Sequence, residues 1–315
     1  MSKKYVWYVA YGANMLKERL ITMLNVEEFR GSQIQYETCN DSSPPKEDKT
    51  ITIPYGLYFG NTAKYWGNQG VAFIDKKTPY SVSLGRAYLV TEEQYYHIQK
   101  QEVKSKTPEK WFGDKIIIPT TNEKYPIWIP TQNLSFRNIH EPSTGYVNIM
   151  FEGICESYYP HVPYGKFHKL LKESIKHLGK PYGKHATGPN TFDCSSFFTE
   201  VYTESGVCNM RRPEWRSAKN KIKAFTEKSN GSFLLKKRTD NMCLGDALFF
   251  CEYGKKGSES DVASHLGIYI GHNLMIHASK RAEEHIGSVR INSLRDGKWL
   301  TRLIGIGRIP PGNPL

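Results

Sequence analysis

A cysteine in the second half of the chain has the placement of a nucleophile. Cys194 follows Thr191-Phe192-Asp193, and either Thr191 or Asp193 can cap a helix that begins at the thiol. At a helix start, unpaired backbone N–H groups and the helix dipole favour the thiolate, which is the reactive form. Many cysteines at such positions only pack against their neighbours, so the position by itself leaves both interpretations open.

Two histidines downstream supply the groups that a thiol nucleophile needs. His265 begins an apolar run, Gly271 and His272 can turn the chain, and His277 lies in the returning run. A hairpin folded about Gly271 or His272 places the two imidazoles opposite or diagonal on one face, about 5–8 Å apart. Activation of a thiol requires a base within hydrogen-bond reach and a third group that orients this base. Cys194, His265 and His277 therefore predict a cysteine-nucleophile site.

A carboxylate in the first half is a second candidate. Thr91-Glu92-Glu93-Gln94 is a capping-box pattern and predicts a helix that extends to about Val103. In this helix Tyr95, Ile98 and Glu102 share one face. Burying a carboxylate is costly, so a glutamate on an apolar face suits a general base or acid. The alternative is a partly exposed glutamate at the helix end.

The first half also carries a loop suited to hold an anion or a carbonyl oxygen. Tyr11-Gly12-Ala13-Asn14 joins a predicted strand at 5–10 to a helix that presents Leu16, Leu20 and Leu24 on one face. Backbone N–H groups at such a strand-to-helix turn bind anions. Tyr11, Gly12, Ala13 and Asn14 are therefore candidate substrate-binding residues.

The elements that must position these residues follow an α+β order. In the first half, after the strand at 5–10 and a polar loop at 38–50, we predict strands at 51–60, 71–74, 84–90, 115–119, 126–130 and 145–151. Strands outnumber helices there, which favours a small barrel-like α+β domain. The second half begins with predicted helices at 167–178 and from Asp193 to Gly206, followed by strands at 247–251, 265–270 and 274–278. The segment 158–165 is the predicted boundary, which gives domains at 1–160 and 161–315.

Composition limits the kind of protein that these domains can form. A chain of 315 residues with 39% hydrophobic and 13% aromatic residues has material for two packed domains and excludes a disordered chain. Six cysteines are too few for a disulfide scaffold, and no apolar run reaches the roughly 18–20 residues that cross a bilayer. The first ten residues lack a cleavage-site pattern, so we expect a soluble, cytoplasmic protein without membrane partners.

The net charge of +12 is distributed unevenly along the chain. Residues 1–160 carry +1 and residues 161–315 carry +11, which suggests two units in different electrostatic environments. The basic residues are dispersed and no nucleic-acid-binding motif is present. We therefore expect no nucleic-acid partner, and a solvated basic surface is the plain interpretation of the charge.

Four motifs of the second half resemble the NlpC family of papain-like cysteine peptidases. They are Phe192-Asp193-Cys194-Ser195, Gly245-Asp246-Ala247-Leu248-Phe249-Phe250, Ser264-His265-Leu266-Gly267-Ile268-Tyr269-Ile270-Gly271 and Met275-Ile276-His277-Ala278. The resemblance implies helices packed on an antiparallel sheet, with Cys194 as nucleophile, His265 as base and His277 as the group that orients it. It also places Tyr182 beside the nucleophile. The family typically cleaves the amide bond between γ-D-glutamyl and a diamino acid in cell-wall peptides.

The first half resembles the γ-glutamylcyclotransferase family. The matching segments are Tyr8-Val9-Ala10-Tyr11-Gly12-Ala13-Asn14, Tyr65-Trp66-Gly67-Asn68-Gln69-Gly70-Val71-Ala72 and Gly85-Arg86-Ala87-Tyr88, with Glu102 beyond them, and 142–153 is similar to the family's closing strand. The resemblance implies a small mixed α/β barrel-like fold in which Glu102 takes a proton from the free α-amine of a γ-glutamyl compound. The amine then attacks the γ-carbonyl, which releases 5-oxoproline without a metal or organic cofactor.

Together these features predict an enzyme directed at γ-glutamyl amide bonds, whose partner is a small γ-glutamyl peptide or amide. Three alternatives stay open. The first domain can be a module that only binds γ-glutamyl ligands, or Cys194 can form an acyl-enzyme that an amine intercepts in a biosynthetic reaction. The third is an exported wall-lytic factor, against which the missing signal pattern argues. No metal site is predicted, because five further cysteines lack metal-ligand spacing: Cys39, Cys155, Cys208, Cys243 and Cys251.

Overall fold

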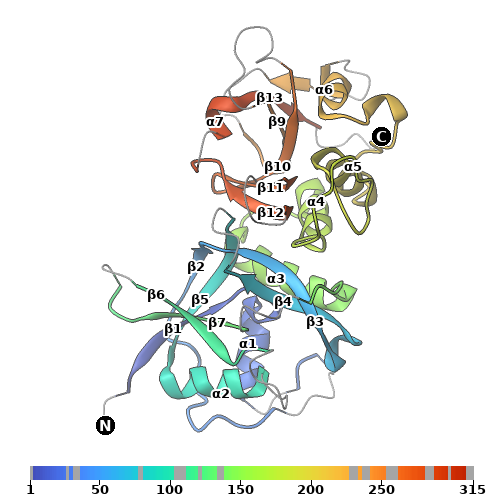
Figure 1. Ribbon diagram of the computed structural model, residues 1–315. Coiled ribbons are helices and arrows are strands. Elements are labelled where there is room, and N and C mark those ends of the chain that lie inside the picture. The colour runs from blue at the N-terminus through green and yellow to red at the C-terminus, as the bar shows by residue number, and fades with distance from the viewer. Residues whose placement is uncertain are drawn as a thin grey trace. The chain divides into compact units, whose positions relative to one another are not determined.

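The chain folds into two compact units (Figure 1). Unit 1 comprises Met1–Lys77 and Ser83–Val162, and unit 2 comprises Thr78–Val82 and Pro163–Leu315. This computed structural model describes residues 3–25, 28–30, 36–76, 81–102, 111–119, 123–132, 138–226, 233–235, 242–252, 262–280, 287–296 and 299–309. Val103, the predicted end of the helix that begins near Thr91, lies outside these residues.

Unit 1 is built on a five-stranded sheet with the order β2-β5-β1-β7-β6. Its strands are β1 (Tyr5–Ala10), β2 (Asp48–Ile53), β5 (Ser83–Thr91), β6 (Asp114–Ile118) and β7 (Ile127–Thr131). The first strand lies at the centre, parallel to β7 and antiparallel to β5, and this position accounts for its continuous apolar run. The strands β3 (Gly56–Ala63) and β4 (Gln69–Asp75) pair separately as an antiparallel hairpin.

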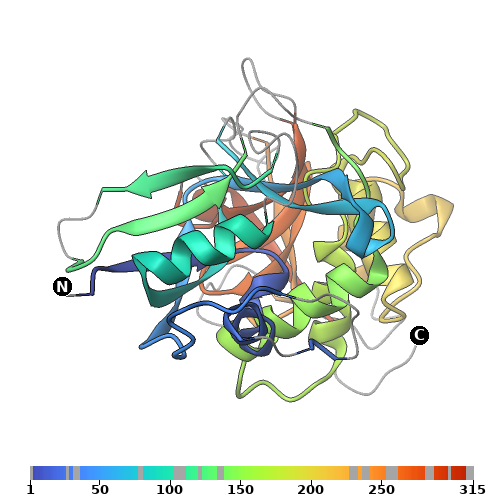
Figure 2. The same ribbon diagram turned by 90° about the horizontal axis from the view of Figure 1, so that it is seen from below.

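The helical elements of unit 1 bring the candidate residues to this sheet. They are η1 (Ala13–Met15), α1 (Lys17–Leu24), η2 (Lys64–Trp66), α2 (Glu92–Glu102) and α3 (Thr144–Tyr158). The helix α2, teal in Figure 2, packs against β1 and β5, while α3 packs against η1. The loop that ends in η1 therefore lies between two helices that come from distant parts of the sequence.

The strand predicted at 145–151, and the closing strand expected over 142–153, are wrong, because this segment is the helix α3. Ser143 is its N-cap, and its Oγ accepts a hydrogen bond of 3.1 Å from the N–H of Tyr146. Tyr146, Met150 and Ile154 recur every four residues on the buried side. A short apolar run does not distinguish a strand from a buried helix, and here the cap and the helical spacing decide.

Unit 2 places helices against one six-stranded sheet, and each pair of neighbouring strands in the described sheet is antiparallel. Its strands are β8 (Phe233–Leu235), β9 (Ala247–Phe250), β10 (His265–Gly271), β11 (Leu274–Ser279), β12 (Ser288–Ser293) and β13 (Leu303–Arg308), in the order β12-β11-β10-β9-β13-β8. Its helical elements are α4 (Lys166–Ile175), α5 (Cys194–Glu204), η4 (Pro213–Trp215), α6 (Ala218–Thr226) and α7 (Trp299–Arg302). The α+β class predicted from the sequence is confirmed in both units.

The hairpin of β10 and β11 fixes the relation between the two candidate histidines. His272 and Asn273 have φ of 52° and 57°, the left-handed pair that a two-residue type I′ turn requires. The register pairs Ile268 with Ile276, so His265 and His277 lie diagonally on one face of the hairpin. The helix α5, which begins at Cys194, packs against both strands.

In the described part of the chain, no helix has the length and apolar character needed to cross a membrane.

The N-cap of α3 gives a first prediction. Ser143→Ala removes the acceptor for the N–H of Tyr146 and should lower the free energy of unfolding by about 1 kcal/mol. Denaturant unfolding of the full chain measures this change. Ser157→Ala is the matched control on the same helix, because its hydroxyl donates only back to carbonyls of the preceding turn, those of Gly153 and Ile154. The expected change is within about 0.5 kcal/mol. Equal effects of the two substitutions would contradict the capping role.

Candidate active sites

Cys194 is the first residue of α5, and Asp193 rather than Thr191 caps this helix. Asp193 Oδ1 accepts from the N–H of Ser196 at 2.6 Å, and Ser196 Oγ accepts from the N–H of Asp193 at 3.0 Å. This reciprocal pair is a capping box, which fixes the start of the helix at the thiol. The thiol lies against the backbone N–H of Leu266, the residue after His265.

Burial sets the protonation state of this thiol. Removal from water and the neighbouring Asp193 carboxylate raise the pKa of Cys194 to about 11, although the N–H of Leu266 opposes this. The backbone N–H of Cys194 at the helix start also lowers this pKa, which is the expected direction, but burial outweighs it. Near neutral pH the resting group is a thiol, which needs a base to remove its proton before it can attack.

A chain of three side chains lies on the strands that α5 packs against. His265 Nε2 is 2.6 Å from His277 Nδ1, and His277 Nε2 is 2.7 Å from Asn292 Oδ1 on β12. An amide oxygen only accepts hydrogen bonds, so Nε2 of His277 carries its proton and Nδ1 of His277 accepts from Nε2–H of His265. A neutral imidazole has one N–H, and the free lone pair of His265 is therefore on Nδ1.

The surroundings keep both imidazoles neutral. Burial lowers the pKa of His277 to about 3, with a further contribution from the positive charge of Arg290. Burial, and then His277, hold the pKa of His265 well below its usual range. The ring of Trp299 contacts both, with its centroid 5.4 Å from that of His265 and 5.1 Å from that of His277. Such a pair can accept a proton transiently but does not form a resting ion pair with the thiol.

The thiol of Cys194 lies beside the start of β10, the strand that begins with His265, but the two side chains do not form a resting hydrogen bond. Among the hydrogen bonds of the described residues, none joins the thiol to an imidazole nitrogen of His265. Catalytic hydrogen bonds are often long in the free enzyme and shorten when substrate binds. Tyr182 lies close enough to the thiol to interact with it electrostatically: burial, and then the charges of Cys194 and Asp193, raise the pKa of Tyr182.

Two residues of this site have no signal in the sequence. Asn292 lies on β12, where the register pairs it with Met275 and so places it diagonal to His277. Lys221 on α6 is buried, and its Nζ donates to the carbonyl of Trp215. Burial lowers the pKa of Lys221 to about 8, while the nearby Asp193 and Cys194 oppose this shift. Its charge also lowers the pKa of the thiol, against the effect of burial.

A surface cavity of about 440 Å³ opens beside the N-terminus of α5. Three arginines, Arg211, Arg212 and Arg216, line it together with Asp193 and Ser196. Arg211 is paired with carboxylates of α5, and the guanidinium of Arg212 lies over the ring of Trp215 at 4.6 Å from its centroid. Two carboxylates, Asp193 and Glu200, line the same cavity, so groups of both charges meet beside the start of α5.

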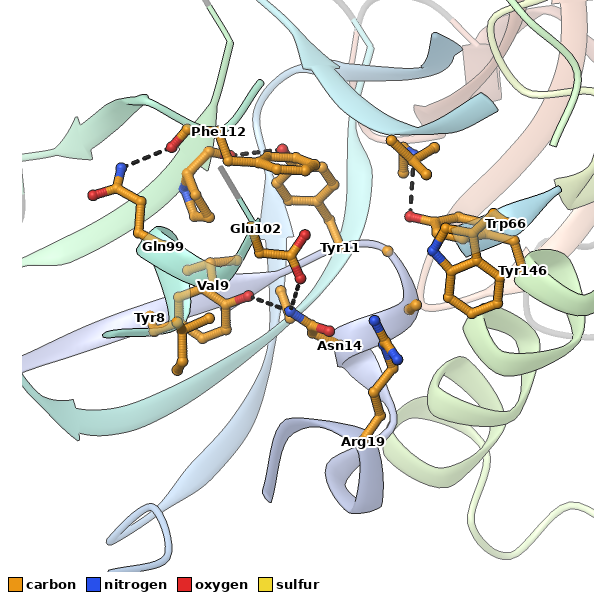
Figure 3. A pocket seen from close by; sticks show the side chains of 17 residues that line it. Tyr8, Val9, Tyr11, Asn14, Arg19, Trp66, Gln99, Glu102, Phe112 and Tyr146 are labelled. Atoms are coloured by element: carbon orange, nitrogen blue, oxygen red, sulfur yellow. Dashed lines mark hydrogen bonds between the residues drawn. The ribbon is translucent and has the colours of Figure 1, made fainter. Parts of the chain in front are cut away.

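Unit 1 encloses a second, smaller cavity of about 50 Å³ (Figure 3). Glu102 at the end of α2 faces this cavity, and its Oε1 accepts from Asn14 Nδ2 at 3.0 Å. The same Nδ2 donates to Tyr8 Oη at 2.9 Å. Glu102 and the Tyr11–Asn14 loop, predicted separately, are thus brought together across 88 positions of sequence.

Polar groups of the Tyr11–Asn14 loop that the sequence suggests are open to a ligand already have partners within the protein. Tyr11 Oη donates to the carbonyl of Pro130 at 2.6 Å, so this hydroxyl holds the loop to β7. The hydroxyl of Tyr146 accepts from the N–H of Ala72 at 3.1 Å and also lies against the N–H of Ala13. The cradle of open backbone donors expected at Ala13 is therefore already filled by a side chain of α3.

Gly12 is needed because of the same hydroxyl. A Cβ at this position would lie 2.3 Å from Tyr146 Oη, far inside the contact distance. Burial raises the pKa of Tyr146 to about 12, so the group stays a neutral hydroxyl. Sequence analysis missed Tyr146, since its segment was expected to be a strand.

Neither site has the ligands of a metal ion. Among the described residues, no three side chains of His, Cys, Asp or Glu gather closely enough to hold one. The five cysteines other than Cys194 are free thiols: Cys39, Cys155, Cys208, Cys243 and Cys251.

Comparison with known proteins identifies the family that unit 2 resembles. Residues 179–308 match the model of the NlpC/P60 family and form an NlpC/P60 domain. The chain is 33% identical over 143 residues to a probable endopeptidase p60 of Listeria grayi, covering 45% of this chain and 23% of that protein. It is 29% identical over 140 residues to the probable peptidoglycan endopeptidase LytE of Bacillus subtilis, covering 44% and 34%. The chain thus spans about a quarter to a third of these relatives.

A solved structure of a gamma-glutamyl cyclotransferase aligns at 18% identity and a TM-score of 0.36, covering 59% of this chain and 93% of that one.

The buried thiol gives a prediction that needs no substrate. With a pKa of about 11, roughly one Cys194 in 10,000 is a thiolate at pH 7, and its alkylation by iodoacetamide should rise about tenfold per pH unit up to pH 10. Mass spectrometry of the modified peptides gives the rate. The exposed Cys243 is the internal control and should react first. A rate for Cys194 that levels off below pH 9 would show that the thiolate is already formed.

Proposed function

With an NlpC/P60 domain in unit 2 as the premise, we propose that this protein is a cysteine peptidase that cleaves γ-D-glutamyl–diamino acid bonds in cell-wall-derived peptides. The observation that carries the proposal is the chain Asn292–His277–His265 beside the start of α5. It leaves one acceptor nitrogen, Nδ1 of His265, for the proton of Cys194.

The reaction begins from two neutral groups. His265 Nδ1 takes the proton of Cys194 while Sγ attacks the γ-carbonyl, and the N-terminal N–H groups of α5 stabilise the charge on the carbonyl oxygen. The imidazolium then gives this proton to the departing amine, which leaves a thioester on Cys194. Water attacks the thioester with His265 as base again, and the γ-glutamyl product and the free thiol are regenerated. His277 accepts from His265 Nε2–H throughout and holds the ring in place.

Substitutions at this site test the peptidase. Cys194→Ala should abolish cleavage of an L-alanyl-γ-D-glutamyl-diamino acid peptide, because it removes the nucleophile. His265→Ala should lower kcat by about 100-fold or more, since it removes the base. Mass detection of the released fragments measures both. Cleavage at the wild-type rate by the alanine variant of Cys194 would exclude this mechanism.

Asn292 is a positioning residue, and two substitutions separate its role from packing. Asn292→Leu removes the acceptor and allows His277 to carry its proton on Nδ1, so kcat should fall about 10–100-fold. Asn292→Asp keeps an acceptor oxygen and should recover most of this loss. If the two variants are equally impaired, the side chain acts through packing and not through the proton position.

A second activity is supported at unit 1. We propose that Glu102 cyclises γ-glutamyl compounds with a free α-amine, since it faces a cavity beside the Tyr11–Asn14 loop. Its carboxylate takes a proton from the α-amine, and the amine nitrogen attacks the γ-carbonyl. The bond to the leaving amine breaks, this amine takes up the proton, and 5-oxoproline is released. The reaction is internal, so the site needs mainly to fold the substrate.

The state of the glutamyl α-amine separates the two sites. In a wall peptide this nitrogen is acylated by alanine and is a poor nucleophile, so the bond yields only to an outside nucleophile such as Cys194. We therefore propose that blocked substrates react at Cys194 and unblocked substrates at Glu102. An acyl-enzyme at Cys194 that an added amine intercepts is the biosynthetic alternative.

A matched pair of substrates, with and without alanine on the glutamyl amine, tests this division. Cys194→Ala should process only the unblocked compound, and Glu102→Gln should lose 5-oxoproline formation but still cleave the blocked one. Mass detection with an added amine shows whether hydrolysis or transfer occurs. If the wild-type protein forms no 5-oxoproline, unit 1 is a binding module. If the two variants have the same substrate preference, the proposed division of substrates between the two sites is wrong.

A further inference from the structure

Arg19 on α1 is a buried cation in the wall of the unit 1 cavity. Arg19 is only 5% exposed to solvent. Figure 3 shows its side chain extending from α1 toward the space between Asn14 and Trp66. The guanidinium carbon lies 5.1–5.6 Å from the ring centroids of Phe29, Tyr65 and Trp66. These rings and Tyr36 surround the guanidinium, which also lines the cavity.

This guanidinium is only partly satisfied by the protein, in which the Tyr36 hydroxyl interacts with it. Nε and Nη1 of Arg19 have no hydrogen-bond partner in the described ranges, and no carboxylate there lies within ion-pair distance of it. Burial by itself lowers the pKa of Arg19, but Tyr36 and Glu102 raise it above its ordinary value, so the group stays charged. A buried charge without a partner is strongly unfavourable, and a bound anion removes this penalty.

Asn14 adds a second unsatisfied atom with the opposite preference. Its Nδ2 donates to both Tyr8 and Glu102, while its Oδ1 has no partner within the part of the chain that is described. This oxygen and the Glu102 carboxylate can each accept a hydrogen bond from a ligand, whereas the Arg19 guanidinium can donate hydrogen bonds to one. A ligand that fits all three carries an anionic group and an N–H group close together.

An α-amino acid head group has this arrangement, since its carboxylate and its amine share one carbon atom. Arg19, Asn14 and Glu102 all line the same cavity, so one ligand head group bound there can reach all three side chains. We propose that Arg19 binds the α-carboxylate of the ligand while Asn14 Oδ1 accepts from its α-amine. Arg19 is then the residue that makes the cavity specific for acidic head groups, which rests on the cyclisation proposed at Glu102.

Titration calorimetry on the full chain tests the proposal with two probes that differ only in charge. 5-Oxoproline carries the carboxylate and a ring N–H, and its primary amide is neutral. The wild-type protein should bind 5-oxoproline at least tenfold more tightly than the amide. Arg19→Met, which keeps the length of the side chain without the charge, should remove this preference. Arg19→Lys should retain part of it.

Three results would overturn the assignment: no binding of 5-oxoproline to the wild type, equal binding of the two probes, or an unchanged preference in Arg19→Met. Thermal melting of each variant checks the fold. If Arg19→Met does not fold, a preference in Arg19→Lys equal to that of the wild type overturns the assignment instead.

Glu102→Gln separates this inference from the function on which it rests. Because the Glu102 carboxylate also faces the N–H of the ligand, this variant should bind both probes with altered affinity, but it keeps Arg19 and should keep the preference for 5-oxoproline over the amide. A preserved preference without any 5-oxoproline formation by the wild type supports the carboxylate site and removes the cyclisation. Cyclisation that persists while Arg19→Met keeps the preference removes only the role of Arg19.

Discussion

The hydrogen bond from Nε2 of His277 to Oδ1 of Asn292 is the constraint on which the thiol site depends. Because an amide oxygen cannot donate, this one bond decides the proton position on His277, which in turn decides it on His265. The nitrogen of His265 that receives the proton of Cys194 is therefore determined by a residue on β12, two strands away from β10 in the sheet. The antiparallel register of β10, β11 and β12 is what keeps the three side chains in line.

Burial acts on the two sites in opposite ways. At Cys194 it raises the pKa of the thiol and lowers the pKa of both imidazoles, so the resting site is neutral and the charge arises only during the reaction. In unit 1 the buried Arg19 keeps its charge, and its Nε and Nη1 have no hydrogen-bond partner among the described residues. The first arrangement suits proton transfer to and from sulfur, while the second suits capture of a ligand that brings the missing charge.

Both sites are assembled from segments that are distant in the sequence. Asn14 and Glu102 meet because η1 follows the central strand and α2 packs back onto the same sheet. Tyr146 then fills the space beside Gly12 from a third element, α3, and removes a backbone donor that the loop would otherwise present. The shape of this cavity is consequently a property of three packed helical elements and not of the loop motif.

The sequence by itself determined the parts that depend on local periodicity and turn chemistry. The helix start at Cys194, the hairpin that carries His265 and His277, and the face of α2 that carries Glu102 follow from caps, turns and spacing within a dozen residues. The segment 145–151 was ambiguous because a short apolar run fits either a strand or a buried helix. It forms a helix because Ser143 caps it and its apolar side packs into the core. Only the tertiary structure shows the roles of four further residues: Asn292, Lys221, Tyr146 and Arg19. Their roles depend on which strand lies next in the sheet and on which polar atoms burial leaves without a partner, and neither is a function of spacing along the chain.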